Sequence, residues 1–223
     1  MTTQTLPLSP APPPAEGPAH LPRPGTYTAT PNRCIAEVTT LLAGLPTARA
    51  RLTPIAATLT VTEDPADCRM ELALDAASLD AGSLTTGRPL LNRRLRGPKG
   101  LHAGRHRRLA FHSEHVEAAG EDGDGHERLI ADGQLTLRGR QIAATLRMRV
   151  VQRGPDLLLV LGRVHVPYRE LRRETGFTLP LTVPARLLRL LVAVEFTPPE
   201  PEPLMSEPAE SEPAAPAPAE PAS

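Results

Sequence analysis

The central part of the chain alternates apolar and polar residues with a period of two. Apolar residues occupy every second position in residues 70–76, 129–137, 142–150 and 188–196, and mostly charged or polar residues stand between them. Successive side chains of a β-strand point to opposite faces of a sheet. The pattern is therefore typical of strands with one buried and one solvated face, as in antiparallel sheets.

Further segments favour strands by their composition. They are residues 33–40, 48–52, 55–62, 109–117 and 156–166. This predicts about eight or nine strands, several of them joined by tight turns such as Arg138-Gly139-Arg140 and Glu121 to Gly125. Helical patterns are limited to Leu90–Leu95 and Tyr168–Arg173.

Many alternating antiparallel strands with few helices indicate an all-β protein, either a closed barrel or a sandwich. The chain contains no Trp and only two Cys, Cys34 and Cys68. An immunoglobulin-like sandwich would be expected to contain a Trp packed against a cysteine pair. The composition therefore favours the barrel.

The two ends of the chain differ from the centre. Residues 1–24 and 198–223 are rich in Pro and Ala, lack apolar periodicity, and include six Glu and no basic residue after Thr197. We expect both to be disordered, solvated tails. Residues 25–197 then form one domain of about +6 net charge, which the acidic tail offsets in a chain of zero net charge.

The sequence also bears on location. No stretch approaches the roughly 20 apolar residues of a membrane-spanning helix, and residues 1–24 lack the basic and apolar regions of a secretory signal. We therefore expect a cytoplasmic protein. In that compartment Cys34 and Cys68 should be reduced, buried side chains and not a disulfide.

Five stretches together resemble a known family. They are TYTATPNRCIAEV (26–38), LDAASLDAG (74–82), LRGPKGLHAGRHRRLAFHSE (95–114), GQLTLRGRQIAATLRM (133–148) and VHVPYRELRRETGF (164–177). In this order they resemble the YceI-like family of lipid- and polyisoprenoid-binding proteins over roughly residues 25–197. The resemblance implies an eight-stranded, lipocalin-like antiparallel barrel that holds a long isoprenoid chain.

The chain also departs from the family pattern. Leu101 stands where the family has Phe, His106 replaces Tyr, and Arg107 replaces Pro. Four or five extra residues also lie between Gly82 and Leu95. These changes fall in the segment that the resemblance places at the mouth of the pocket, so we expect a rebuilt mouth.

The barrel interior is open to two interpretations. An eight-stranded barrel is just wide enough to be filled by side chains or to hold one slender ligand. The pattern alone favours a filled core, whereas the resemblance favours a lipid, for which each buried CH₂ contributes about 0.8 kcal/mol. The apolar positions expected to line the interior are Ala36, Val38, Leu72, Leu74, Leu135, Leu137, Ile142, Ala144, Leu146, Met148, Leu190, Val192 and Val194.

Basic residues are concentrated between Arg88 and Arg108, where no Asp or Glu occurs. One interpretation is a solvated loop, and another is nucleic-acid binding, although residues 88–108 contain no aromatic residue for base stacking. The resemblance places this segment at the open end of the barrel. It implies that Arg93, Arg94, Arg96 and Lys99 face an anionic head group or an anionic membrane surface.

Two groups of polar residues bear on a possible metal site. His102, His106, His112 and His115 lie close in sequence, but we expect His112 and His115 on opposite faces of a strand, and we predict no metal site. The loop from Asp122 to Gly125 lacks the acids of a calcium-binding loop and is predicted to be a hairpin.

Catalytic motifs are also lacking. Ser78 and Ser113 are not part of a nucleophile elbow, and no Gly-rich phosphate-binding loop occurs. We therefore expect a non-enzymatic protein without a cofactor. It either binds, stores or transports a lipid or, as the alternative, has a filled barrel and recruits a protein or nucleic acid through its basic loop or tails.

Overall fold

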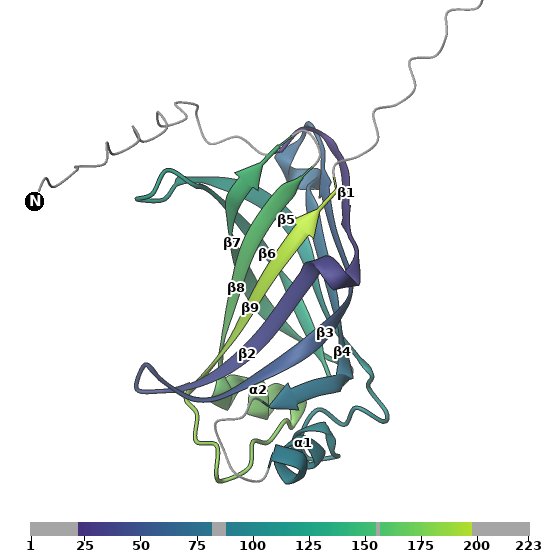
Figure 1. The fold of residues 1–223 in the computed structure, drawn as a ribbon, viewed down its shortest axis with the longest axis vertical. Coiled ribbons are helices and arrows are strands. Elements are labelled where there is room, and N and C mark those ends of the chain that lie inside the picture. Colours follow the sequence, from purple (N-terminus) through teal and green to yellow (C-terminus); the bar gives the residue numbers. More distant parts are fainter. Residues whose placement is uncertain (1–21, 82–87, 155–156, 198–223) are drawn as a thin grey trace, which may run out of the picture.

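Nine antiparallel strands form one sheet, and eight of them close into a barrel (Figure 1). The computed structural model describes residues 22–81, 88–154 and 157–197. The strands are β1 (Gly25–Ala29), β2 (Cys34–Leu42), β3 (Leu45–Val61), β4 (Arg69–Ala81), β5 (Arg108–Glu121), β6 (Glu127–Leu137), β7 (Arg140–Arg153), β8 (Leu158–Pro167) and β9 (Leu187–Phe196). The helices are α1 (Arg88–Arg96) and α2 (Tyr168–Thr175), with short 3₁₀ turns η1 (Pro31–Arg33) and η2 (Pro65–Asp67). The predicted all-β barrel with two short helical segments is confirmed.

Closure of the barrel depends on the long strand β3. Its neighbour on one side is β4, and on the other side it pairs first with β2 and then with β1. The short strand β1 and strand β2, separated by the η1 turn, thus lie one after the other along the same side of β3. Thr28 and Thr197 exchange two backbone hydrogen bonds of 2.8 and 3.3 Å. Through this bridge β1 fills the space between β3 and the end of β9.

The prediction of two strands around Pro54 was wrong, because β3 runs through it without a break. The pairing of β3 with β4 shifts register on both sides of this proline, between Arg51 and Thr53 and between Pro54 and Ala56. Proline has no backbone N–H to donate and is tolerated in a strand at such bulges. The two predicted segments are therefore one strand bent at its proline.

A second bulge corrects the prediction for two histidines. His112 pairs with Gln134 and His115 pairs with Asp132, while Glu114 is left over between them. Gln134 and Asp132 lie two residues apart and share the outer face of β6. The extra residue therefore turns His112 and His115 to the same outer face, where an unbroken strand would have placed them on opposite faces.

Two hairpins fix the register of neighbouring strands. The loop residues are Ala43-Gly44 between β2 and β3 and Arg138-Gly139 between β6 and β7, all with φ between 51° and 82°. Positive φ at both positions is the geometry of the two-residue turn that matches the twist of paired strands. The predicted turn at Arg138-Gly139 is confirmed.

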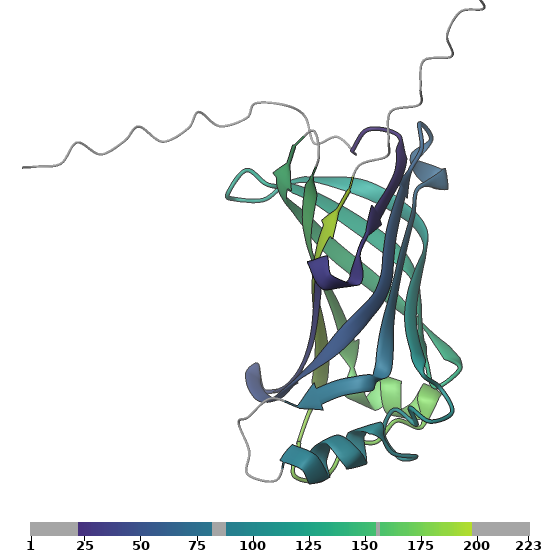
Figure 2. The same ribbon diagram turned by 45° about the vertical axis from the view of Figure 1, so that its right-hand side comes forward.

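Both helices lie across the same end of the barrel, opposite the end where β9 finishes (Figures 1 and 2). Leu95 of α1 and Leu171 of α2 are buried in the core there. The predicted tails fall largely outside the described residues, which begin at Pro22 and end at Thr197. Pro22 is itself buried, and the carbonyl of Arg23 accepts a 3.0 Å hydrogen bond from Tyr27. Among the described helices, none is long and apolar enough to cross a membrane.

Candidate ligand-binding site

The predicted lining residues all lie on the inner, apolar face of the barrel wall. Those that are buried are Ala36, Leu72, Leu74, Leu137, Ile142, Leu146, Met148, Leu190, Val192 and Val194. Val38, Leu135 and Ala144 are half-buried and pack against the same core. Each follows from the period-two alternation, which sends every second side chain inward.

Packing is not uniform along the barrel. Near the end of β9 that carries Phe196, the inner side chains of Leu59 and Phe196 are 0 % exposed. Toward α1 and α2, Leu188 and Leu190 are 9 % exposed, and Val38, the partner of Leu190, is half-buried. These inner side chains at the helical end are therefore more exposed than Leu59 and Phe196 at the other end.

Small residues on the inner face do not all leave space. A Cβ added to Gly162 would lie 2.7 Å from Val192 and 2.9 Å from Leu146, whose side chains fill the gap. A Cβ added to Gly133 would lie 2.1 Å from the carbonyl oxygen of His112. These glycines allow close packing of side chains and of strand β5, so volume for a ligand must come from elsewhere.

Basic side chains gather outside the helical end. Arg93 and Arg94 of α1 and Lys99 of the next loop line a groove of about 610 Å³, which we call the basic groove. Its remaining walls are Leu90, Gly97, Pro98, Thr178, Leu179 and Pro180. Within the described residues no carboxylate lies within 4 Å of the three charged groups. The groove therefore combines unpaired positive charge with an apolar wall.

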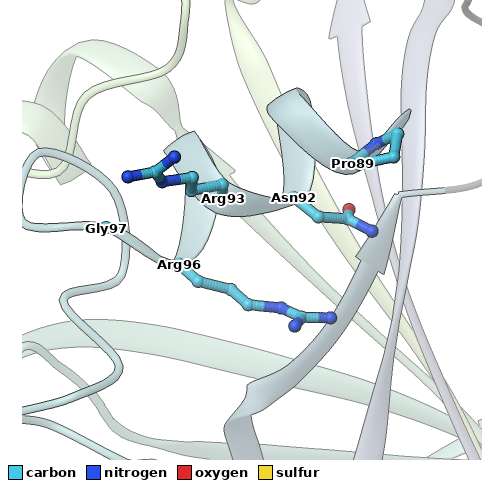
Figure 3. A pocket seen from close by; sticks show the side chains of 5 residues that line it. All are labelled: Pro89, Asn92, Arg93, Arg96 and Gly97. Atoms are coloured by element: carbon cyan, nitrogen blue, oxygen red, sulfur yellow. The ribbon is translucent and has the colours of Figure 1, made fainter. Parts of the chain in front are cut away.

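The fourth predicted cation has a different place. Figure 3 shows Arg96 extending away from Arg93, and its Nε donates a 2.8 Å hydrogen bond to the carbonyl of Leu79 in β4. Asn92 beside it accepts from the amide of Ala81 and donates to Asp80, both at 2.7 Å. Arg96 and Asn92 thus hold α1 against the barrel and line a separate hollow of about 570 Å³.

The opposite wall of the basic groove comes from the loop between α2 and β9. The amide of Thr178 donates to the carbonyl of Lys99 at 2.8 Å, and the amide of Leu179 donates to the Tyr168 hydroxyl at 2.9 Å. Arg138 donates to the carbonyls of Gly176 and Pro98 at 2.5 and 3.0 Å. These contacts join the two walls of the groove.

The family model of the YceI-like domain matches residues 27–186. The chain belongs to the YceI-like domain family. No curated protein matches the sequence.

Several solved structures are similar to this YceI-like domain. BcnA of Burkholderia cenocepacia is 16% identical with a TM-score of 0.54, over 75% of this chain and 98% of that one. A polyisoprenoid binding domain from Saccharophagus degradans is 12% identical with a TM-score of 0.48, over 78% and 98%. The YCEI protein of Campylobacter jejuni is 15% identical with a TM-score of 0.47, over 67% and 85%.

The three residues expected to depart from the family pattern lie at the same end of this YceI-like domain. Leu101 is buried with Leu95 beneath α1. His106 packs edge to face on His102, with ring centroids 5.6 Å apart, and its pKa is lowered by burial and by the neighbouring Arg105. Arg107 pairs with Asp75 at 3.2 Å and lowers the pKa of that carboxyl group. All three residues therefore lie in the cap at the helical end and not among the predicted lining residues of the wall.

Ser113 and Ser78 accept hydrogen bonds from backbone amides where the strand pairing is irregular. Ser113, fully buried, accepts a 2.6 Å hydrogen bond from the amide of Met70. Ser78 accepts from the amide of Thr53 at 2.7 Å and donates to the carbonyl of Asp75 at 2.6 Å. Each hydroxyl lies beside a bulge and satisfies a backbone group there.

One group of possible metal ligands occurs among the described residues: Asp122, Asp124 and His126 in the hairpin between β5 and β6. Arg149 is 3.2 Å from Asp122 and 3.4 Å from Asp124. Asp122 also accepts from the amides of Asp124 and His126 at 3.0 and 2.9 Å. A guanidinium therefore occupies the position beside these carboxylates, and the loop is the predicted hairpin.

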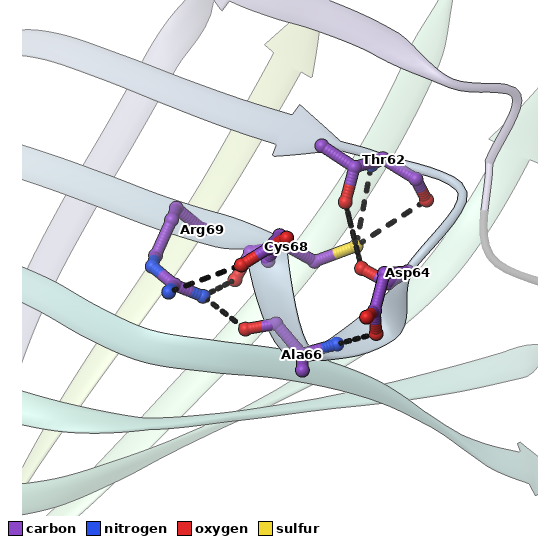
Figure 4. Close-up of polar contacts among 6 residues, drawn as sticks. Thr62, Asp64, Ala66, Cys68 and Arg69 are labelled. Atoms are coloured by element: carbon purple, nitrogen blue, oxygen red, sulfur yellow. Dashed lines mark hydrogen bonds and ion pairs between the residues drawn. The ribbon is translucent and has the colours of Figure 1, made fainter.

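Both cysteines are free and buried, as expected. The thiol of Cys68 lies in the turn between β3 and β4, close to Thr62 and Asp64 (Figure 4). Its sulfur accepts a 3.4 Å hydrogen bond from the amide of Thr62. Burial, followed by the charge of Glu195, raises the pKa of the Cys34 thiol.

Sequence reasoning missed the second wall of the basic groove. Thr178, Leu179 and Pro180 are far in sequence from α1 and belong to no strand or helix. The apolar residues Phe177, Leu179 and Val183, which are buried in the core, were a signal that this loop packs on the barrel. Nothing in their spacing indicates α1 as the partner.

Proposed function

We propose that this YceI-like domain binds one long-chain, apolar lipid of the isoprenoid class inside the barrel. The observation that carries the proposal is the residual exposure of aliphatic side chains on the inner wall near α1 and α2, above all Val38 and Leu135. Aliphatic walls suit a hydrocarbon chain, and each CH₂ transferred from water contributes about 0.8 kcal/mol. Membership of the family supports the same ligand class.

The basic groove supports a second part of the proposal, that the head group of the lipid is anionic. Leu179 is part of the buried core and also lines the groove, so the groove adjoins the core at the helical end of the barrel. Arg93, Arg94 and Lys99 would then contact a phosphate while the chain passes beside Leu90 and Leu179. An anionic membrane surface at the same cations would deliver such a lipid.

The test is analysis of an organic extract from protein purified without detergent. A stoichiometric long-chain lipid is expected in wild type. Leu135→Trp fills the inner wall and should reduce the bound lipid, whereas Gln134→Trp, the neighbouring outward position, should not. Unfolding midpoints of both variants establish that they are folded. Protein without lipid, or equal loss in both variants, would favour the filled barrel and the recruitment of a macromolecular partner.

A further inference from the structure

The outer face of the barrel carries a cluster of basic residues far from the basic groove. We call Arg147 of β7, Arg163 and His165 of β8 and Arg189 of β9 the outer basic cluster. Arg147 lies directly opposite Arg163, and His165 directly opposite Arg189, in the strand pairing. Like charges at directly opposed positions of a sheet, as in the pair of Arg147 and Arg163, are destabilising. The arrangement therefore calls for a negative partner.

Within the described part of the chain, no carboxylate is paired with this cluster. None of the three arginines forms an ion pair there, and the Nε of Arg189 is enclosed without a hydrogen-bond acceptor. Burial and the three arginines lower the pKa of His165. Across a hollow of about 560 Å³ lie Glu114 and Asp132, of which Asp132 already accepts from the Thr145 hydroxyl.

An apolar patch lies beside the outer basic cluster. Ile35, Ala193 and Leu161 form one cross-strand row over β2, β9 and β8, and all three point outward. Ile35 is 62 % exposed and Leu161 is 36 % exposed. Leu191 lies on the outer face of β9 between this row and Arg189. From Thr197 back toward α2, the outward residues of β9 are Glu195, Ala193, Leu191 and Arg189. The outer face of this strand thus changes from acidic to apolar and then to basic.

The chain itself supplies a matching segment directly after β9. Residues 200–212 read EPEPLMSEPAESE, with Leu204-Met205 between acidic residues and no basic residue. Arg189 precedes Thr197 by eight residues, or about 26 Å at roughly 3.3 Å per strand residue. Glu207 follows Thr197 by ten residues, or about 31 Å at roughly 3.1 Å per residue of extended, Pro-rich chain. A segment that turns back along β9 thus reaches the cluster.

We propose that residues 200–212 dock on the outer face of β8 and β9 of the same chain. Leu204 and Met205 cover Leu161, Leu191 and Ala193, and the glutamates from Glu207 onward lie among Arg147, Arg163 and Arg189. Covalent attachment gives the segment an effective concentration on the order of millimolar, so a weak contact suffices. The basic groove lies at the far end of β9, beyond the reach of Glu207. The proposal is independent of lipid binding.

The test is nuclear magnetic resonance of the full-length chain with a nitroxide on Ser206→Cys. Cys34 and Cys68 are buried, and wild type taken through the same labelling controls for their reaction. At low salt we expect paramagnetic broadening of the amides of Leu161, Arg163 and Leu191. About 0.5 M salt should remove it, since the Debye length shrinks from about 10 Å at 0.1 M toward 3 Å at 1 M.

Variants identify the contact. Glu207→Gln/Glu210→Gln/Glu212→Gln, and separately Arg147→Gln/Arg163→Gln/Arg189→Gln, should each abolish the broadening. The matched control Arg93→Gln/Arg94→Gln/Lys99→Gln should leave it unchanged. A mixture of nitroxide-labelled and isotope-enriched chains should show none. The proposal is overturned by absence of broadening at β8 and β9, by broadening centred on α1, by its survival in both charge variants, or by its appearance between chains.

Discussion

The buried hydroxyl of Ser113 in β5 accepts a hydrogen bond from the amide of Met70 in β4, with 2.6 Å between oxygen and nitrogen. The regular β4–β5 pairing runs from Glu71 to Asp75 on β4, so Met70 lies just beyond it. The side chain of Ser113 thus supplies an acceptor to a backbone amide next to the end of the β4–β5 ladder.

Removal of this hydroxyl should therefore destabilise the barrel. Ser113→Ala leaves the Met70 amide without an acceptor in a dry site, and we expect a loss of about 1–3 kcal/mol in unfolding free energy. Chemical denaturation measures it. Ser78→Ala is the matched control, since Ser78 is half-buried and water can replace its hydroxyl. An equal loss in both variants would contradict the interpretation.

Packing between Leu146 and Gly162 can be tested by a double-mutant cycle. Leu146→Ala should cost about 2–5 kcal/mol, and Gly162→Ala should cost about 1–3 kcal/mol, because its Cβ would meet Leu146 and Val192. The double variant should lose less than the sum, since the new methyl group enters the space that Leu146 leaves. Additive losses would mean that the two positions do not share this space.

Packing should also vary along the barrel axis. In delipidated protein, Leu158→Ala, a buried residue opposite Phe196, should give the full core loss of about 2–5 kcal/mol. In a lipid-binding barrel, Leu190→Ala at the helical end should lose less, because its side chain would border the volume that the lipid vacates. Unfolding free energies of the two variants provide the comparison. A full core loss at Leu190 would argue for a filled barrel.

Charge in the basic groove should select the lipid head group. Arg93→Gln/Arg94→Gln/Lys99→Gln should weaken binding of a polyprenyl phosphate about tenfold or more at low salt, which corresponds to about 1.4 kcal/mol. Binding of the uncharged polyprenol should be unchanged. Fluorescence titrations of both lipids measure this, with Arg105→Gln, exposed in the same segment, as the matched control. Equal effects on the two lipids would leave the solvated-loop interpretation.

Acid should destabilise the hairpin between β5 and β6 through Asp122. Hydrogen bonds from the backbone of His126 and Asp124, together with Arg149, lower the pKa of Asp122 to about 2. The folded pKa lies below the unfolded value of about 3.9, so this stabilisation is present above pH 4 and is lost as the pH falls toward 2. Unfolding at pH 2 to 5 should show a shallower pH dependence in Asp122→Asn than in wild type. An unchanged slope would contradict the contribution of Asp122.

The sequence predicted what depends on periodicity and not what depends on irregular pairing. Alternation located the strands and their inner faces, from Ala36 in β2 to Val194 in β9. The bulges at Pro54 and Glu114 could not be predicted from the sequence. An extra residue in a strand changes the face of every later side chain without altering the composition. The short strand β1 has no long alternating run, and it exists because β3 and the end of β9 offer it partners.

The candidate site divides in the same way. The cations of α1 were visible as a run of basic residues, but their separation into groove-lining Arg93, Arg94 and Lys99 and the anchoring Arg96 depends on the carbonyl of Leu79. The loop that forms the second wall approaches α1 only after β8, α2 and β9 have been placed. Such contacts between distant segments leave no local signal in the sequence.

The bridge between Thr28 and Thr197 brings the first and last strands into direct contact. A short linker could therefore join the two ends of the barrel without altering any strand pairing, and new ends could be opened at the Arg138-Gly139 hairpin. Such a circular permutant should retain the barrel, since every pairing except β2 with β9 and the contacts of β1 joins strands that are near neighbours along the chain. The order of the strands around the barrel, more than the position of the chain ends, then defines this fold.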